Sequence, residues 1–144
     1  RHPPGDLAAA PAGKIRRMSN PHKGRTGWQR MVWATRHSMH GLRLAWRTEN
    51  AFRQEATAAA LMLPASLWLG RNGVEVALLA GSVLAVLIVE LLNSAVEAAI
   101  DRVSYELHDL SRRAKDFGSA AVLLSLLACA SIWLGLLYDR LGAP

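Results

Sequence analysis

The sequence predicts an all-α integral membrane protein, in which a basic amphipathic surface helix precedes three transmembrane helices. Two observations lead to this fold class. Of the 144 residues, 51% are hydrophobic and 19% are charged, and the two kinds fall in separate blocks along the chain. A soluble domain would interleave them at the period of a helix or strand, whereas a bilayer requires long apolar blocks. Each of the three blocks is also long enough to cross about 30 Å of hydrocarbon as a helix.

The chain begins with two segments that contain no apolar block. Residues 1–25 are rich in Pro, Gly, Ala and basic residues, so we expect a disordered basic tail. Residues 26–48 have helical spacing, with apolar side chains on one stripe and basic ones on the other. This pattern favours an amphipathic helix in the membrane interface over a surface helix packed on a soluble core. The stripes are Trp28, Met31, Val32, Thr35, Met39, Leu42 and Trp46, against Arg30, Arg36, His37, His40, Arg43 and Arg47.

The three predicted transmembrane helices cover residues 51–69, 74–100 and 118–138. Arg53, Gln54 and Glu55 lie in the first turns of the first helix, so this end should lie near the lipid headgroups. Trp68 is a suitable aromatic anchor at the other end. A short Gly-Arg-Asn-Gly turn joins the first helix to the second, and Trp133 lies towards the far end of the third.

The distribution of charge predicts how the chain crosses the membrane. The net charge is +6, and Asp6 is the only acid between Arg1 and Arg47. With three crossings, the N-terminus and the basic segment 101–116 lie on one side, and the positive-inside rule makes that side cytoplasmic. A basic chain can also bind nucleic acid, but a basic excess next to a transmembrane segment favours membrane lipid as the partner. We therefore expect no nucleic-acid partner.

Cys129 is the only cysteine, which excludes a disulfide framework and a cysteine-based zinc site within one chain. It lies in an apolar run, so we expect it to contribute to packing. The N-terminus lacks an apolar core, and we expect no cleavable signal peptide.

The second predicted span carries a row of polar residues. Glu90, Asn93, Glu97 and Asp101 are three, four and four residues apart, which places them on one helical face. A carboxylate inside a membrane helix is unfavourable by several kcal/mol unless it is paired, hydrated or metal-bound. The row therefore indicates a functional polar site. The alternative is a set of interhelical hydrogen bonds or ion pairs near the membrane edge.

The depth of these residues suggests a division of roles. Glu90 lies deeper and could act as a general base on a hydroxyl group presented at the interface. Glu97 lies nearer the cytoplasm and, with Glu49, could bind a magnesium ion that bridges phosphates. Asn93 could orient either carboxylate or a substrate hydroxyl. Because Arg53 follows Glu49 by four residues, a simple helical ion pair is the alternative for Glu49.

A third group of residues is Ser111-Arg112-Arg113-Ala114-Lys115-Asp116. A lysine with neighbouring arginines at the start of a helix suits a polyphosphate, although the cluster could reflect only the positive-inside rule. The chain has no Walker A loop, GxGxxG or HExxH motif. Phosphoryl transfer depends mainly on positioning, a metal and charge neutralisation, which carboxylates and basic residues at a membrane edge can supply.

These strings resemble the bacterial integral-membrane diacylglycerol kinases over about residues 28–140. The resemblance rests on Glu-x-x-Asn-x-x-x-Glu together with Lys-Asp in one three-span chain. The matching strings are Ala51-Phe52-Arg53-Gln54-Glu55, Glu90-Leu91-Leu92-Asn93-Ser94-Ala95-Val96-Glu97 with Asp101-Arg102, and Ala114-Lys115-Asp116 followed by Gly118-Ser119-Ala120-Ala121-Val122.

The resemblance implies a membrane kinase domain over residues 26–144. It implies a homotrimer with active sites between neighbouring subunits, in a bacterial inner (cytoplasmic) membrane. The implied reaction converts diacylglycerol to phosphatidic acid, with ATP as the phosphoryl donor and Mg²⁺ as the cofactor.

The resemblance also implies roles for individual residues. Glu90 resembles the catalytic base, Asn93 its support, and Glu49 and Glu97 the metal ligands. The implied nucleotide contacts are Arg30, His37, Glu49, Glu97, Glu106, Lys115 and Asp116. The implied lipid contacts are Arg30, Ala51, Phe52, Arg53, Gln54, Glu55, Trp68, Glu90, Ser119 and Trp133. At His37 the sequence departs from a member of the family that has tyrosine there; a histidine can also stack or form hydrogen bonds.

Two other functions fit parts of this pattern. Undecaprenol kinases share the Glu-x-x-Asn and Lys-Asp motifs, but the Ala-Phe-Arg-Gln-Glu string favours diacylglycerol. A non-enzymatic membrane adaptor or channel subunit would use the buried carboxylates for assembly. In that case Glu90→Gln would leave its activity intact.

Overall fold

The computed structural model describes residues 27–103 and 108–142, and all of the regular elements in these ranges are helices. They are α1 (Gly27–Thr48), α2 (Asn50–Leu69), α3 (Gly73–Val103) and α4 (Asp109–Gly142). The predicted all-helical fold is confirmed. The predicted basic tail, residues 1–25, lies outside the described residues.

The chain divides between Arg36 and His37 into two compact units. The first turns of α1 belong to the first unit. Thr35 lies there, and its hydroxyl donates to the Met31 carbonyl one turn earlier, at 3.0 Å. The last turns of α1 belong to the second unit together with α2, α3 and α4. The site described below is built from this second unit.

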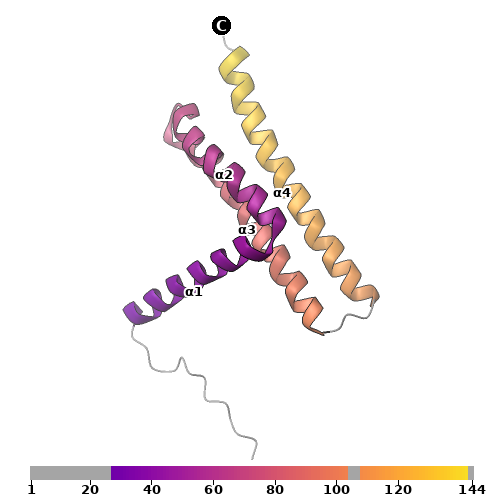
Figure 1. The fold of residues 1–144 in the computed structure, drawn as a ribbon. Coiled ribbons are helices and arrows are strands. Elements are labelled where there is room, and N and C mark those ends of the chain that lie inside the picture. The colour runs from indigo at the N-terminus through magenta and orange to yellow at the C-terminus, as the bar shows by residue number, and fades with distance from the viewer. Residues whose placement is uncertain (1–26, 104–107, 143–144) are drawn as a thin grey trace, which may run out of the picture. The chain divides into compact units, whose positions relative to one another are not determined.

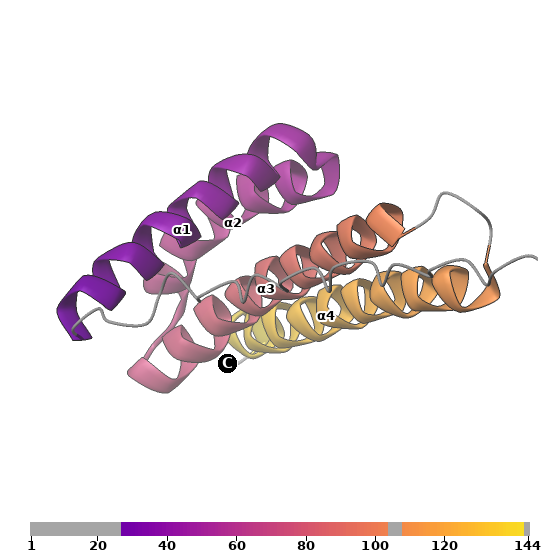
Figure 2. The same ribbon diagram turned by 90° about the horizontal axis from the view of Figure 1, so that it is seen from below.

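Within the second unit, α3 packs against both α2 and α4. Figures 1 and 2 show that α3 and α4 run side by side in opposite directions. A small cluster of buried residues joins the three helices and consists of Ala59 on α2, Val83 and Val86 on α3, and Cys129 on α4. The expected packing role of Cys129 is therefore confirmed.

The turn between α2 and α3 is tight and well capped. The Gly70 amide donates to the Ser66 carbonyl at 3.0 Å as α2 ends. The Asn72 side-chain oxygen accepts from the Val74 and Glu75 amides, each at 3.0 Å, and so satisfies two N–H groups that the start of α3 would leave unpaired. The Glu75 carboxylate accepts in return from the Arg71 amide at 2.8 Å.

Helix α4 starts well before its predicted apolar span, because the polar segment ahead of residue 118 is helical too. The His108 ring accepts from the Leu110 amide at 3.3 Å, and the His108 carbonyl accepts from the Arg112 amide at 3.1 Å. These bonds pair backbone N–H groups at the start of α4 that would otherwise have no partner within the helix. An apolar pattern alone does not predict this helix start. The extra turns place Lys115 beside α3.

Two of the described helices, α3 over Gly73–Arg102 and α4 over Asp109–Gly142, are long and apolar enough to cross a membrane. Helix α2 has 20 residues but does not meet this criterion. Its first turns carry Arg53, Gln54 and Glu55, which lower the mean hydropathy of a short helix. Many leucines of α3 and α4 are exposed in the single chain, as is typical of helices that face lipid or another subunit.

Candidate active site

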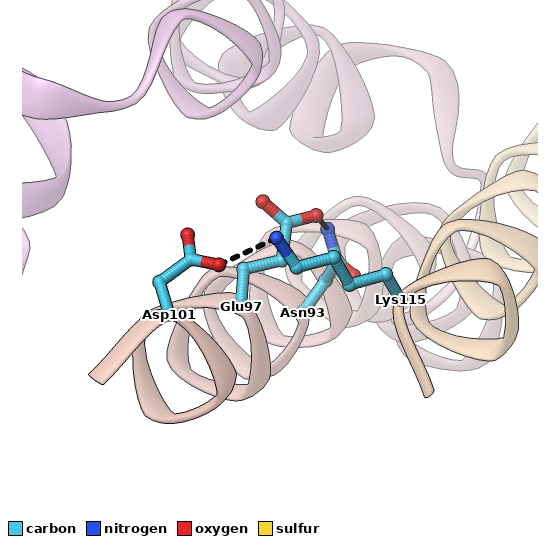
Figure 3. A network of polar contacts seen from close by, with 4 residues as sticks. All are labelled: Asn93, Glu97, Asp101 and Lys115. Carbon is cyan, nitrogen blue, oxygen red and sulfur yellow. Dashed lines mark hydrogen bonds and ion pairs between the residues drawn. The ribbon is translucent and has the colours of Figure 1, made fainter. Parts of the chain in front are cut away.

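The polar row predicted on α3 lies on one face of that helix, where it meets the start of α4. Figure 3 shows Asn93, Glu97 and Asp101 in succession along α3, with Lys115 reaching them from α4. The Asn93 amide nitrogen donates to Glu97 Oε1 at 3.1 Å, one turn along the helix. The Lys115 ammonium donates to Asp101 Oδ1 at 2.6 Å, across the two helices. Nearly the whole predicted row is thus engaged in polar contacts.

Glu90 is the exception in this row. The residue is only 4% exposed, and no hydrogen bond or ion pair to its side chain is found among the described residues. It lies close enough to Glu49, Glu55 and Glu97 for the carboxylates to repel one another. A buried carboxylate without a partner is unfavourable by several kcal/mol, so packing alone does not explain it. The arrangement suits a group that accepts a proton or binds a hydroxyl group.

Asn93 holds Glu97 through its amide nitrogen, while its amide oxygen faces the backbone of α4. Asn93 Oδ1 is buried and has no hydrogen-bond partner in the described part of the chain. It lies directly against the position that a Cβ atom would take at Gly118. Glycine therefore allows α3 and α4 to approach closely at this point.

Lys115 and Asp101 form the cross-helix ion pair of the site. Their side chains are 41% and 46% exposed, so the pair is accessible from solvent. A pair this exposed contributes at most about 1 kcal/mol to stability, which favours a functional role for Lys115 over a purely structural one. Asp116 and Ser119 follow on the same helix and are exposed.

Glu49 stands at the junction of α1 and α2, where its backbone is extended. It borders an open pocket of about 500 Å³ between the last turns of α1 and the middle of α3. The α3 wall of this pocket is formed by Leu91 and small residues, Ser94, Ala95 and Ala98. The pocket is largely apolar, with a carboxylate at one edge, and such a lining suits an amphipathic ligand.

The predicted Ala51–Glu55 string occupies the first turns of α2. Phe52 is buried, whereas Ala51 and Gln54 are exposed. Arg53 does not pair with Glu49, since its guanidinium donates to the Asn50 side chain and to the Arg47 carbonyl. Glu55 lines a small cavity between α2, α3 and α4. Its Oε2 atom is buried and has no hydrogen-bond partner in the described ranges.

The remaining predicted site residues lie in different parts of the chain. Arg30 belongs to the first unit, and Glu106 lies outside the described residues. His37 is exposed on α1. Trp68 lies near the far end of α2 and is 80% exposed. Trp133 packs against the core, and its ring nitrogen donates to the Leu79 carbonyl at 3.3 Å.

The residues present fit Mg²⁺ that arrives with a nucleotide better than a resident metal ion. No group of three or more His, Cys, Asp or Glu side chains that could hold a metal occurs in residues 27–103 and 108–142. Glu49 and Glu97 carry carboxylate oxygens near Glu90. Mg²⁺ is commonly bound by one or two carboxylates together with substrate phosphates and water, so two glutamates are a sufficient protein contribution.

Two features of the site were not predicted from the sequence. The first is the role of Gly118, which belongs to one of the matching strings and whose contact with Asn93 depends on the packing of α3 and α4. The second is the pocket wall of Ser94, Ala95 and Ala98. Their small side chains share one face of α3, and this spacing was the available signal.

Comparisons with known proteins agree on one family. The family model described as "Prokaryotic diacylglycerol kinase" matches residues 36–137. A diacylglycerol kinase of Escherichia coli (strain K12) is 46% identical over 117 residues, covering 81% of this chain and 96% of the relative. One from Pseudomonas aeruginosa is 45% identical over 114 residues, covering 79% and 93%. One from Haemophilus influenzae is 42% identical over 113 residues, covering 78% and 96%.

Proposed function

The chain belongs to the prokaryotic diacylglycerol kinase family, and we propose that it transfers the terminal phosphoryl group of ATP to the free hydroxyl of diacylglycerol. The products are phosphatidic acid and ADP. The observation that carries the proposal within the structure is Glu90, a buried carboxylate on α3 for which the described residues provide no hydrogen-bond or ion-pair partner. A non-enzymatic adaptor or channel subunit does not fit this family.

In the proposed reaction, Glu90 accepts the proton of the diacylglycerol hydroxyl as its oxygen attacks the terminal phosphorus of ATP. The bond between that phosphorus and the bridging oxygen of ADP breaks, and ADP leaves. A base of this kind contributes about 10²–10⁴-fold to the rate.

The nucleotide part of the proposed site lies at the cytoplasmic end of α3. Glu49 and Glu97 would hold Mg²⁺, which neutralises phosphate charge when bound. Asn93 supports this arrangement through its 3.1 Å hydrogen bond to Glu97. Lys115 would release its ion pair with Asp101 and bind a phosphate group of the nucleotide instead. The other proposed nucleotide contacts are Asp116, His37, Arg30 and Glu106.

The lipid part of the proposed site lies where α2 and the last turns of α1 meet α3. The apolar pocket beside Glu49 opens within the same unit and has room for part of a lipid. The proposed lipid contacts, besides Glu90, are Arg30, the string Ala51, Phe52, Arg53, Gln54 and Glu55, and Trp68, Ser119 and Trp133.

We propose that α2 crosses the membrane together with α3 and α4, and that the chain is a homotrimer in the bacterial inner membrane. The hairpin of α2 and α3 supports the third crossing, because the two helices pack along each other from a tight turn. The exposed leucines on α3 and α4 form an apolar surface that another subunit could cover. The basic excess before α2 supports placing the N-terminus and residues 101–116 in the cytoplasm.

The substrate is tested by giving the purified protein radiolabelled ATP and Mg²⁺ with either diacylglycerol or undecaprenol in mixed micelles. We expect label in phosphatidic acid and little or none in the polyprenol. Label in the polyprenol alone would assign the chain to the undecaprenol kinase activity instead.

A further inference from the structure

The contact between Gly118 and Asn93 joins α4 to the polar row of α3. A Cβ atom added at Gly118 would overlap Asn93 Oδ1 and come within 3.2 Å of Asn93 Cγ. The obstructing atoms are the amide end of a side chain and not backbone, so the helices need not move apart to admit a methyl group. The amide of Asn93 would turn away instead.

Turning this amide has a consequence one helical turn away. Asn93 Nδ2 donates the 3.1 Å hydrogen bond to Glu97 Oε1, and Oδ1 of the same planar amide faces Gly118. Because the amide is rigid, displacing its oxygen also displaces its nitrogen. Oδ1 is buried and finds no partner in the described part of the chain, so no hydrogen bond of its own holds it there. The amide can take this orientation because Gly118 has no side chain to occupy the space.

We propose that Gly118 is a positioning residue that sets the Asn93 amide and, through it, the Glu97 carboxylate. Its effect on catalysis rests on the proposed function, in which Glu97 binds the magnesium of MgATP. Residues that orient metal-binding side chains typically change metal affinity or activity by about 10–100-fold when they are altered. Gly118 would act in this way without contacting either substrate.

The structural part of the proposal is tested without substrate or metal, by NMR of the side-chain amides after labelling with ¹⁵N-asparagine. The chain has only the asparagines Asn20, Asn50, Asn72 and Asn93. Loss of a signal in Asn93→Ala identifies that residue. We expect Gly118→Ala to shift the Asn93 side-chain signals while those of Asn50 and Asn72 stay in place.

Gly81→Ala is the matched control, because Gly81 is also helical and no atom lies within 4 Å of the Cβ it would gain. It should leave the Asn93 signals unchanged. If Gly118→Ala also leaves them unchanged, the proposal is wrong. This result does not depend on whether the protein phosphorylates any lipid, so it separates failure of this proposal from failure of the proposed function.

The catalytic part is tested by the steady-state kinetics of the same variants with diacylglycerol and MgATP. We expect Gly118→Ala to raise the KM for MgATP by about 10-fold or more and to change the KM for diacylglycerol by less than about twofold. Adding Gly118→Ala to Asn93→Ala should have little further effect, because both act through one amide. Equal changes in both KM values, or additive effects, would indicate general disruption and contradict the proposal.

If Gly118→Ala does not give folded protein, the double variant with Asn93→Ala decides the matter. Removing the amide frees the space that the new methyl group needs. Recovery of the fold in the double variant supports the proposal, and failure to recover contradicts it.

Discussion

At the scale of single residues, the three carboxylates on the polar face of α3 are held in different ways. Asp101 is paired with Lys115, Glu97 accepts from Asn93, and Glu90 is buried without a partner among the described residues. The alternative of interhelical ion pairing therefore accounts for Asp101 alone. Glu90 and Glu97 remain available to act on a substrate.

Lys115 and Asp101 provide a test at this scale. We expect Lys115→Gln to raise the KM for MgATP by about 10-fold or more, because the proposed phosphate contact loses its charge. Asp101→Asn keeps that charge and should change the KM much less. Because both side chains are substantially exposed, the free energy of unfolding of each variant should lie within about 1 kcal/mol of that of the wild type.

Steady-state kinetics at several ATP concentrations, with unfolding followed in the same detergent, measures both quantities. If Asp101→Asn impairs ATP use as severely as Lys115→Gln, the ion pair itself is required, and Lys115 does not act simply as a phosphate ligand.

At the scale of elements, the apolar and amphipathic patterns were enough to predict the helices. The predicted ranges 26–48, 51–69 and 74–100 compare with α1 at Gly27–Thr48, α2 at Asn50–Leu69 and α3 at Gly73–Val103. Helix α4, at Asp109–Gly142, begins several residues before the predicted transmembrane span 118–138, because its first turns are polar and start at a His108 cap that hydropathy does not reveal. The hydropathy pattern predicts which residues lie in an apolar span, but it does not predict the residues at which a helix begins and ends.

The candidate site was predictable only in part, for a similar reason. The spacing of Glu90, Asn93, Glu97 and Asp101 depends on one helix, so a single sequence can reveal it. The pairing of Lys115 with Asp101 depends on the register between α3 and α4. That register is set by tertiary packing, including the close approach at Gly118, which periodicity along one helix does not contain.

The turn between α2 and α3 provides a test at the scale of elements. A Cβ at Gly70 would lie 2.9 Å from the Val76 backbone nitrogen and 3.1 Å from the Ser66 carbonyl oxygen, and backbone atoms cannot readily move aside. We expect Gly70→Ala to lower the free energy of unfolding by about 1–3 kcal/mol. Gly73→Ala should be neutral or slightly stabilising, since nothing lies within 4 Å of its added Cβ.

Unfolding of both variants in detergent by circular dichroism measures this difference. Equal stability of the two variants would show that the turn opens to admit the methyl group. That result would contradict the close packing of α2 against α3 at this end.

At the scale of the whole molecule, the chain leaves a large apolar surface exposed. The buried core of α2, α3 and α4 is small, while residues such as Leu84, Ile88, Leu124 and Leu134 are exposed on α3 and α4. Surfaces of this kind need lipid or another subunit to cover them. The chain is therefore a membrane protein whose stability depends on its surroundings.

The proposed three-span topology is tested by cysteine labelling in intact cells. In a Cys129→Ala background, Arg47→Cys and Arg71→Cys place single thiols before and after α2. If α2 crosses the membrane, a membrane-impermeant maleimide should label Arg71→Cys in spheroplasts, and Arg47→Cys only after permeabilisation. Labelling of both positions from the same side would show that only α3 and α4 cross.

The central claim is that Glu90 is the base for phosphorylation of diacylglycerol. It is tested most directly by comparing wild type and Glu90→Gln in mixed micelles with diacylglycerol, ATP and Mg²⁺, after confirming that both have the same oligomeric state. The account predicts a fall in kcat of about 10²–10⁴-fold with MgATP still bound. A Glu90→Gln variant that keeps nearly full turnover would contradict it.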